Sequence, residues 1–199
     1  MGLQTLGPAP AAPIALSDAK AWLRVGHAGE DAAITALINT AASRVEAETG
    51  RALLVRNFRE TLDGWPIRRL SGCGSAFALA VAPAVSVEAV RTFDRAGEET
   101  LWDAEEYRVD TAADPGRLIA RAPFAFPRPG RLAAGIEIDF TAGYGETASD
   151  VPPALIEAVL RLVAEGYAAS EPSLATGRGP ARLPETVEAL LKPFRQVRL

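Results

Sequence analysis

The chain has 199 residues, of which 48% are hydrophobic and 23% are charged. This length and apolar content suffice for a sizeable core, so a chain that is disordered throughout is excluded. The 21 basic and 25 acidic residues give a formal net charge of −4, which argues against a general electrostatic affinity for nucleic acid.

The apolar stretches are broken by Arg, Glu or Pro well short of the roughly 20 residues that a membrane helix needs, so we expect no membrane span. No charged start followed by an apolar run resembles a signal peptide, and the single cysteine excludes an internal disulfide. Abundant arginine and alanine are typical of a GC-rich bacterial genome. We therefore expect the chain to be made in the bacterial cytoplasm.

Residues 1–15 are rich in Gly, Pro and Ala without periodicity, which predicts a flexible N-terminal arm. Order is expected from residue 16, where Ser17 is a candidate N-cap for a short helix. A longer helix is predicted over 30–49, because apolar residues recur there at helical spacing and Gly50 follows as a stop signal.

From Leu53 the apolar period changes from about 3.6 to 2, which predicts strands. Phe58, Glu60 and Leu62 fall on one side of the first of them. The further strand candidates are residues 77–81, 85–94, 107–111, 117–120 and 135–144. Because the connections are too short for crossover helices, we expect one sheet of about five or six mostly antiparallel strands.

The helical period returns over 154–170, where apolar residues cover more than one face of the helix. Asp150 is a candidate cap for this helix. A loop is predicted over 171–183, and a last short helix ends before Pro193.

The fold class predicted from this order is α+β. Two N-terminal and two C-terminal helices form a helical core over 16–52 and 150–192, and a β-rich insertion lies between them over 53–142. We expect these segments to make a single domain over 16–192, followed by a C-terminal tail over 193–199.

The tail combines apolar Phe194, Val197 and Leu199 with Arg195 and Arg198. Chain ends tend towards small polar residues unless something holds them in place, so this composition predicts a binding partner. That partner is either the protein's own core or another chain.

No residue pattern predicts a catalytic or metal site. The only histidine, His27, lies in a glycine-flanked turn without carboxylates at ligand spacing, and Cys73 has no neighbouring activating residue. We therefore expect no catalysis, no metal and no cofactor. An enzyme that uses His27 or Cys73 is kept as an alternative, and loop arginines such as Arg178 and Arg182 leave contact with nucleic acid open.

Four segments in their order resemble the head–tail connector, or adaptor, family of long-tailed phages and phage-derived gene transfer agents. They are LSDAKAWLRV, EDAAITALINTAASRVEAETGRALL, IDFTAGYG leading into VPPALIEAVLRLVA, and LPETVEALLKPFRQVRL. The resemblance spans residues 16–199. It implies a helical core with a β-rich insertion between the second and third long helices.

The resemblance also implies a structural protein that docks on the portal protein as a ring of about twelve copies and extends the DNA channel. A downstream neck or tail protein would be its other partner, and DNA would pass through the channel without specific binding. The expected location is the neck of a phage or gene transfer agent particle, and no reaction is implied. We further hypothesise that an acidic channel wall lets DNA pass without adhering.

By this resemblance the C-terminal helix and tail bind the portal. The residues expected there are Leu190, Leu191, Phe194, Arg195, Val197, Arg198 and Leu199. For contacts between neighbouring subunits we nominate the helix over 154–168, through Leu155, Val159, Leu162 and Tyr167, and the β-rich insertion. The resemblance assigns no role to the loops at 68–76 and 171–183.

Another neck component is the first alternative to an adaptor. A stopper or a tail terminator would share the ring-forming behaviour but would bind the tail side instead of the portal.

Overall fold

The computed structural model describes residues 2–8, 11–66, 68–69, 75–121, 125–169 and 183–196. The chain divides into two compact units. The strand unit consists of Met1–Pro10 and Val55–Gly143, and the helical unit consists of Ala11–Leu54 and Tyr144–Leu199. Helices and antiparallel sheets are both present, which confirms the α+β class. These bounds lie close to those predicted for the helical core, 16–52 and 150–192, and for the β-rich insertion, 53–142; that both belong to a single domain stays a prediction.

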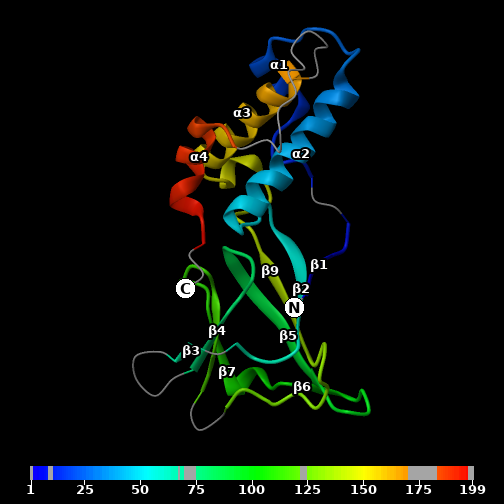
Figure 1. Ribbon diagram of the computed structural model, residues 1–199, viewed down its shortest axis with the longest axis vertical. Coiled ribbons are helices and arrows are strands. Elements are labelled where there is room, and N and C mark those ends of the chain that lie inside the picture. Colours follow the sequence, from blue (N-terminus) through cyan, green and yellow to red (C-terminus); the bar gives the residue numbers. More distant parts are fainter. Residues whose placement is uncertain are drawn as a thin grey trace. The chain divides into compact units, whose positions relative to one another are not determined.

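The described helices gather in the helical unit (Figure 1). Their bounds are α1 Leu16–Leu23, α2 Asp31–Thr49, α3 Pro153–Ala169 and α4 Glu185–Leu191, with short 3-10 turns η2 Ala148–Asp150 and η4 Lys192–Phe194. Helices α2 and α4 both pack against α3. The hydrophobic core of this unit has Ile34, Ile38, Val45, Leu155, Val159 and Val163 at its centre, each at most 1% exposed.

The ends of these helices follow local sequence signals. Helix α2 ends at Gly50, whose φ of 69° suits the left-handed conformation that closes a helix. Helix α3 begins at Pro153, where the missing N–H leaves no hydrogen bond unmade. The predicted N-cap Ser17 is wrong, because α1 begins one residue before it and Ala15 is the cap residue.

Asp150 caps the turn before α3 instead of α3 itself. Its Oδ2 accepts hydrogen bonds from the backbone N of Thr147 at 2.9 Å and from the Thr147 hydroxyl at 2.8 Å. These bonds to Thr147 lower the pKa of Asp150 below its usual value. They close η2 into a capping box and hold the chain at the entry to α3.

The described strands of the strand unit form two sheets, where the sequence analysis expected one. The first sheet has the order β1-β2-β9-β5-β6 and the second has the order β3-β4-β8-β7. The bounds are β1 Gly2–Leu6, β2 Arg56–Leu62, β3 Arg68–Arg69, β4 Ser75–Ala78, β5 Ala84–Phe93, β6 Glu99–Leu101, β7 Tyr107–Asp110, β8 Arg117–Ala120 and β9 Ile136–Ala142, with a 3-10 turn η1 Ala104–Glu106. Every described strand pair is antiparallel, as predicted.

The period-2 pattern of β2 is confirmed by its burial. Phe58, Glu60 and Leu62 are each at most 3% exposed, and Phe58 stacks on Phe140 of β9 with ring centroids 5.6 Å apart. The buried Glu60 carboxylate accepts a hydrogen bond from the backbone N of Ala80 at 3.0 Å, as a buried polar group requires.

Strand β1 replaces the flexible arm that the sequence predicted for the first residues. It pairs with β2 from Gly2↔Thr61 to Leu6↔Asn57. An edge strand offers a row of backbone donors and acceptors to any extended segment, whatever its side-chain pattern. Such pairing leaves no alternation of apolar residues in the sequence, and most β1 residues are exposed.

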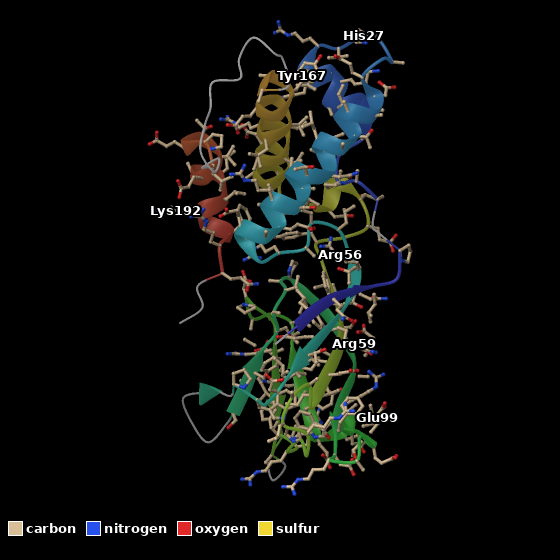
Figure 2. All side chains as sticks on the ribbon, turned by 45° about the vertical axis from the view of Figure 1, so that its right-hand side comes forward. His27, Arg56, Arg59, Glu99, Tyr167 and Lys192 are labelled. Carbon is tan, nitrogen blue, oxygen red and sulfur yellow. The ribbon has the colours of Figure 1, made fainter. Side chains whose placement is uncertain are left out.

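An ion-pair network crosses the first sheet with Asp139 of β9 at its centre. Figure 2 labels two of its members, Arg59 and Glu99. Arg59 of β2 binds Asp139 through two hydrogen bonds of 2.6 and 2.8 Å, and Arg91 of β5 binds it at 2.5 Å. Glu137 also binds Arg59, at 3.3 Å, and Glu99 also binds Arg91, at 3.1 Å. The hydrogen bond from Arg59 and the bond from Arg91 lower the pKa of Asp139, although burial opposes the shift.

The loop that follows Pro127 packs closely on the end of β5. The backbone N of Gly130 donates to the carbonyl of Phe93 at 2.8 Å. A Cβ at Gly130 would lie 2.7 Å from the Cα of Asp94 and 2.8 Å from the N of Arg95. Only glycine permits this approach of two backbones.

No helix among the described residues is long and apolar enough to cross a membrane.

Replacing Asp139 by asparagine is expected to destabilise the chain by about 1–3 kcal/mol at neutral pH, because two arginines lose their charged acceptor. The lowered pKa means that this stability is present above the usual carboxyl value of 3.8 and is lost as pH falls through the lower folded value. Urea unfolding of wild type and Asp139→Asn at neutral and acid pH measures both effects. The exposed Glu98→Gln variant is the control, and equal acid sensitivity of all three proteins would contradict the prediction.

Gly130→Ala is expected to lower stability by about 1–3 kcal/mol, because the added methyl overlaps backbone atoms that have no rotamer to change. Gly64→Ala is the matched control, since a Cβ at Gly64 meets no atom within 4 Å. Thermal unfolding of both variants tests the comparison. A Gly130→Ala variant as stable as Gly64→Ala would show that the loop has room to move.

Candidate interaction site

The C-terminal segment that the sequence analysis assigned to portal binding packs on its own helical unit. Val187 and Leu191 of α4 are fully buried. Leu190 and Phe194 are partly buried and pack against the same core. Burying an aliphatic or aromatic side chain of this kind stabilises by about 1.5–3 kcal/mol, so these residues anchor the segment.

Arg51, directly after the α2 stop signal, holds the end of this segment. Its Nε donates to the backbone carbonyl of Phe194 at 2.7 Å, and its Nη1 donates to the Tyr144 hydroxyl at 3.2 Å. The guanidinium also lies over the Phe194 ring, 5.8 Å from its centroid. Arg51 is 8% exposed, so these contacts replace the water that its charge has lost.

Arg195 and Gln196 bind the C-terminal end of α2. Arg195 pairs with Glu48 at 3.1 Å and with Glu188 at 3.2 Å. The backbone N of Gln196 donates to the Thr49 carbonyl at 3.3 Å, and its side-chain amide donates to the Gly50 carbonyl at 2.9 Å. These bonds satisfy carbonyls that the end of α2 leaves open.

The structure therefore brings together the described residues of the predicted portal-binding set. Each of these described residues has a partner within its own chain. Leu191 and Phe194 lie against the core, and Arg195 is paired with two carboxylates. Val197, Arg198 and Leu199 lie outside the described residues. No sequence pattern singles out Arg51, on which the end of the segment depends.

The predicted subunit-interface residues on α3 lie inside the helical unit. Leu155 and Val159 are fully buried, and Leu162 is 7% exposed, so in this fold they offer almost no surface to another subunit. The Tyr167 hydroxyl donates to the Glu30 carboxylate at 2.6 Å. In this structure Leu155, Val159 and Leu162 serve the unit's own core, and a role for this set in contacts between subunits stays a prediction.

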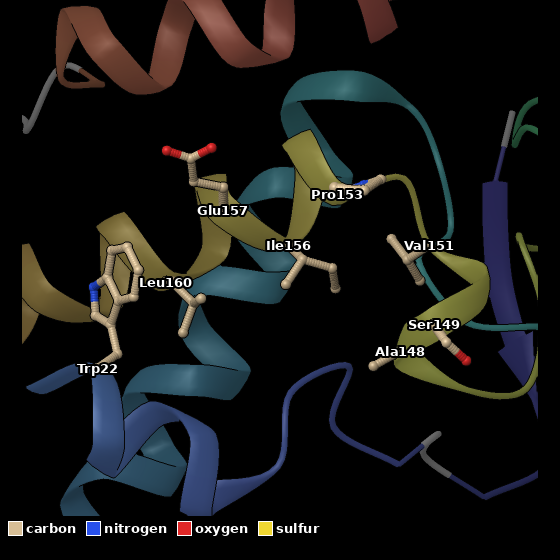
Figure 3. A pocket seen from close by; sticks show the side chains of 8 residues that line it. All are labelled: Trp22, Ala148, Ser149, Val151, Pro153, Ile156, Glu157 and Leu160. Carbon is tan, nitrogen blue, oxygen red and sulfur yellow. The ribbon is translucent and has the colours of Figure 1, made fainter.

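Another part of α3 borders an open apolar groove (Figure 3). Its volume is about 520 Å³, and Ile156 and Leu160 of α3 and Trp22 of α1 supply its apolar sides. The full set of lining residues is Trp22, Ala148, Ser149, Val151, Pro153, Ile156, Glu157 and Leu160. The groove residues of α1 and α3 are part of the apolar pattern of these helices. The pattern alone does not show which of the apolar residues line a groove and which lie in the core.

The polar groups of this groove already have partners within the chain. The Ser149 and Thr147 hydroxyl oxygens are 2.7 Å apart. The Glu157 carboxylate accepts two hydrogen bonds from Arg161, at 3.0 and 2.6 Å. The remaining lining is apolar, so the groove is suited to binding apolar side chains.

The described residues contain no group of three or more His, Cys, Asp or Glu side chains that would hold a metal ion. His27 lies in the loop between α1 and α2 with its side chain 66% exposed, 3.8 Å from Glu30. Figure 2 shows His27 and Tyr167 at the same end of the helical unit. Cys73 lies outside the described residues.

No protein-family model and no curated protein matches this chain. Solved structures do match it over its full length. One is described as the neck of an empty GTA particle computed with C6 symmetry, with 30% sequence identity and a TM-score of 0.77. Two others come from the virion of a native gene transfer agent particle and from its neck computed with C12 symmetry, with 30% identity and TM-scores of 0.75 and 0.72.

Each of these matches covers 100% of this chain and 97% of the matched chain. The similarity therefore includes both the strand unit and the helical unit, and it agrees with the order of segments noted in the sequence. The chain belongs to the family of gene transfer agent neck proteins.

Proposed function

We propose that this chain is the head–tail adaptor of its particle, a structural protein that docks on the portal as a ring, extends the DNA channel and provides a platform for the tail. The observation that carries the proposal is the 30% identity, over the whole chain, to neck proteins of gene transfer agents. A similarity that leaves no part of the chain uncovered supports the same structural role for both units.

The ring is supported by the symmetry of the similar structures, which are necks computed with C6 and C12 symmetry. We propose a ring of about twelve copies of this chain. In a closed ring each copy contacts its two neighbours through two different surfaces, so the chain must carry two complementary faces.

Portal binding is assigned to the end of the C-terminal segment. Arg51 binds the Phe194 carbonyl, Glu48 and Glu188 bind Arg195, and the Gly50 carbonyl binds Gln196, so the described part of the segment is held on the helical unit. Fixing a segment before it binds lowers the entropic cost of association. We propose that Val197 and Leu199 enter apolar sites on the portal and that Arg198 pairs with acidic groups or carbonyls there.

Passage of DNA without specific binding is supported by those described arginines that are paired with carboxylates. Arg59, Arg91, Arg117, Arg161 and Arg195 each have a carboxylate partner within 3.3 Å. An arginine that is already paired gains less from a phosphate contact. Together with the net charge of −4, this pairing favours a channel component that does not retain DNA.

Removing residues 197–199 is expected to abolish binding to the portal ring while leaving the fold intact, because the described contacts that anchor the segment are made by residues up to Gln196. Co-sedimentation with the portal from the same genome measures the effect. The full chain should bind in a subunit ratio near one to one, and the truncated chain should remain in the supernatant.

Two variants separate the contributions within the tail. Val197→Ser combined with Leu199→Ser removes the apolar contacts, and Arg198→Gln removes the charge. Lys192→Ala changes an exposed neighbour and serves as control. Equal binding by the full and truncated chains would reject the role of the tail, whereas a full chain that binds only tail-side neck proteins would identify a stopper or tail terminator.

A further inference from the structure

We propose that the groove between Trp22, Ile156 and Leu160 is the seat for a second copy of this chain, and that apolar side chains of the neighbouring copy fill it. The inference rests on the proposed ring and deepens it, because it assigns one of the two faces through which the copies meet. It replaces the buried α3 residues Leu155, Val159 and Leu162 as the subunit contact.

The groove exposes apolar surface that the described residues of the helical unit leave uncovered. The Trp22 side chain is among the large exposed hydrophobic residues, at 49%. Ile156 and Leu160 are only partly buried, and all three line the same space (Figure 3). A contiguous apolar surface of this kind with a tryptophan at its edge is typical of a protein contact.

The chemistry of the groove selects a protein surface over a small polar ligand. A small-molecule site needs a few convergent polar groups to orient its ligand. Here Ser149 is engaged with Thr147, and Glu157 is engaged with Arg161. The rest of the lining is mainly hydrocarbon, and removing hydrocarbon surface from water favours association.

The floor of the groove is fixed before anything binds. The capping box between Thr147 and Asp150 holds η2, which carries the lining residues Ala148 and Ser149. Gly145 lies against the Asp150 side chain so closely that a Cβ would overlap it. A preformed binding site loses little conformational entropy when a partner binds.

A second copy is the occupant that the symmetry favours. Chains 30% identical to this one come from necks computed with C6 and C12 symmetry, and cyclic symmetry repeats a chain around one axis. Cyclic contacts are heterologous, and they require a surface that complements a different surface on the next copy. A concave apolar groove is suited to one side of such a pair, and every copy then uses its groove once.

Photo-crosslinking identifies the occupant directly. A Trp22→p-benzoylphenylalanine variant is irradiated in purified particles and also as a concentrated solution of the free chain. Mass spectrometry then identifies the attached peptide. A crosslink from position 22 to another copy, in either sample, is the expected result. Attachment only to the portal or to another neck protein, or no copy-to-copy crosslink in both samples, would overturn the inference.

A blocking variant tests the same contact by assembly. Ala148 is exposed and lines the groove, so Ala148→Arg should leave the fold intact but fill the seat with a charged side chain. We expect the crosslinked or ring-assembled fraction to fall about tenfold or more, which corresponds to about 1.4 kcal/mol. Trp22→Ala, which removes one wall, should act in the same direction.

The matched control is Leu132→Arg, which makes a similar polarity change at a 98% exposed position of the strand unit. It should assemble like wild type, and unchanged thermal unfolding verifies the fold of each variant. Normal assembly of both groove variants would reject the groove as a subunit contact. If the wild-type chain does not co-sediment with the portal, the adaptor role is contradicted instead. The crosslink from position 22 to another copy can still be measured in that case.

Discussion

Burial of α3 is the constraint on which the helical unit depends. Its residues Leu155, Val159 and Val163 have no exposed surface, and α2 and α4 are the helices that cover them. Since α2 ends at Thr49 and is followed directly by Gly50 and Arg51, packing α2 on α3 brings the binding partners of the C-terminal segment into position. The same apolar arc thus determines both the core and the location of the chain's last described residues.

The helices and most strands were predictable because their signals are local. Gly50 ends α2, and the alternation of Phe58, Glu60 and Leu62 marks one buried side of β2. The division into two sheets was not predictable, since β9 pairs with β2 and β5, and neither is its neighbour along the chain. Strand β1 was missed because backbone pairing at an edge requires no side-chain pattern.

The composition of the tail predicted a partner but did not distinguish the chain's own core from another protein. Part of the answer lies in an interaction that no sequence pattern reveals. The Arg51 side chain binds the backbone carbonyl of Phe194, 143 positions away, and a carbonyl is present at every residue. Composition therefore indicates that a segment will be held, whereas the fold decides which of its residues are used internally and which remain for a partner.

The apolar arc of α3 shows the same limit at finer scale. Successive residues of an α-helix point about 100° apart, so Leu155 and Ile156 lie on one continuous arc in any sequence-based projection. In the structure the first is fully buried and the second lines the groove. The width of the arc thus indicated that α3 packs in the core on one side and borders another surface on the other. Deciding which residue lies on which side required the positions of α1 and α2. A subunit contact made through Ile156 and Leu160 leaves the core intact, which is the property that a chain needs if it is to fold before it joins a ring.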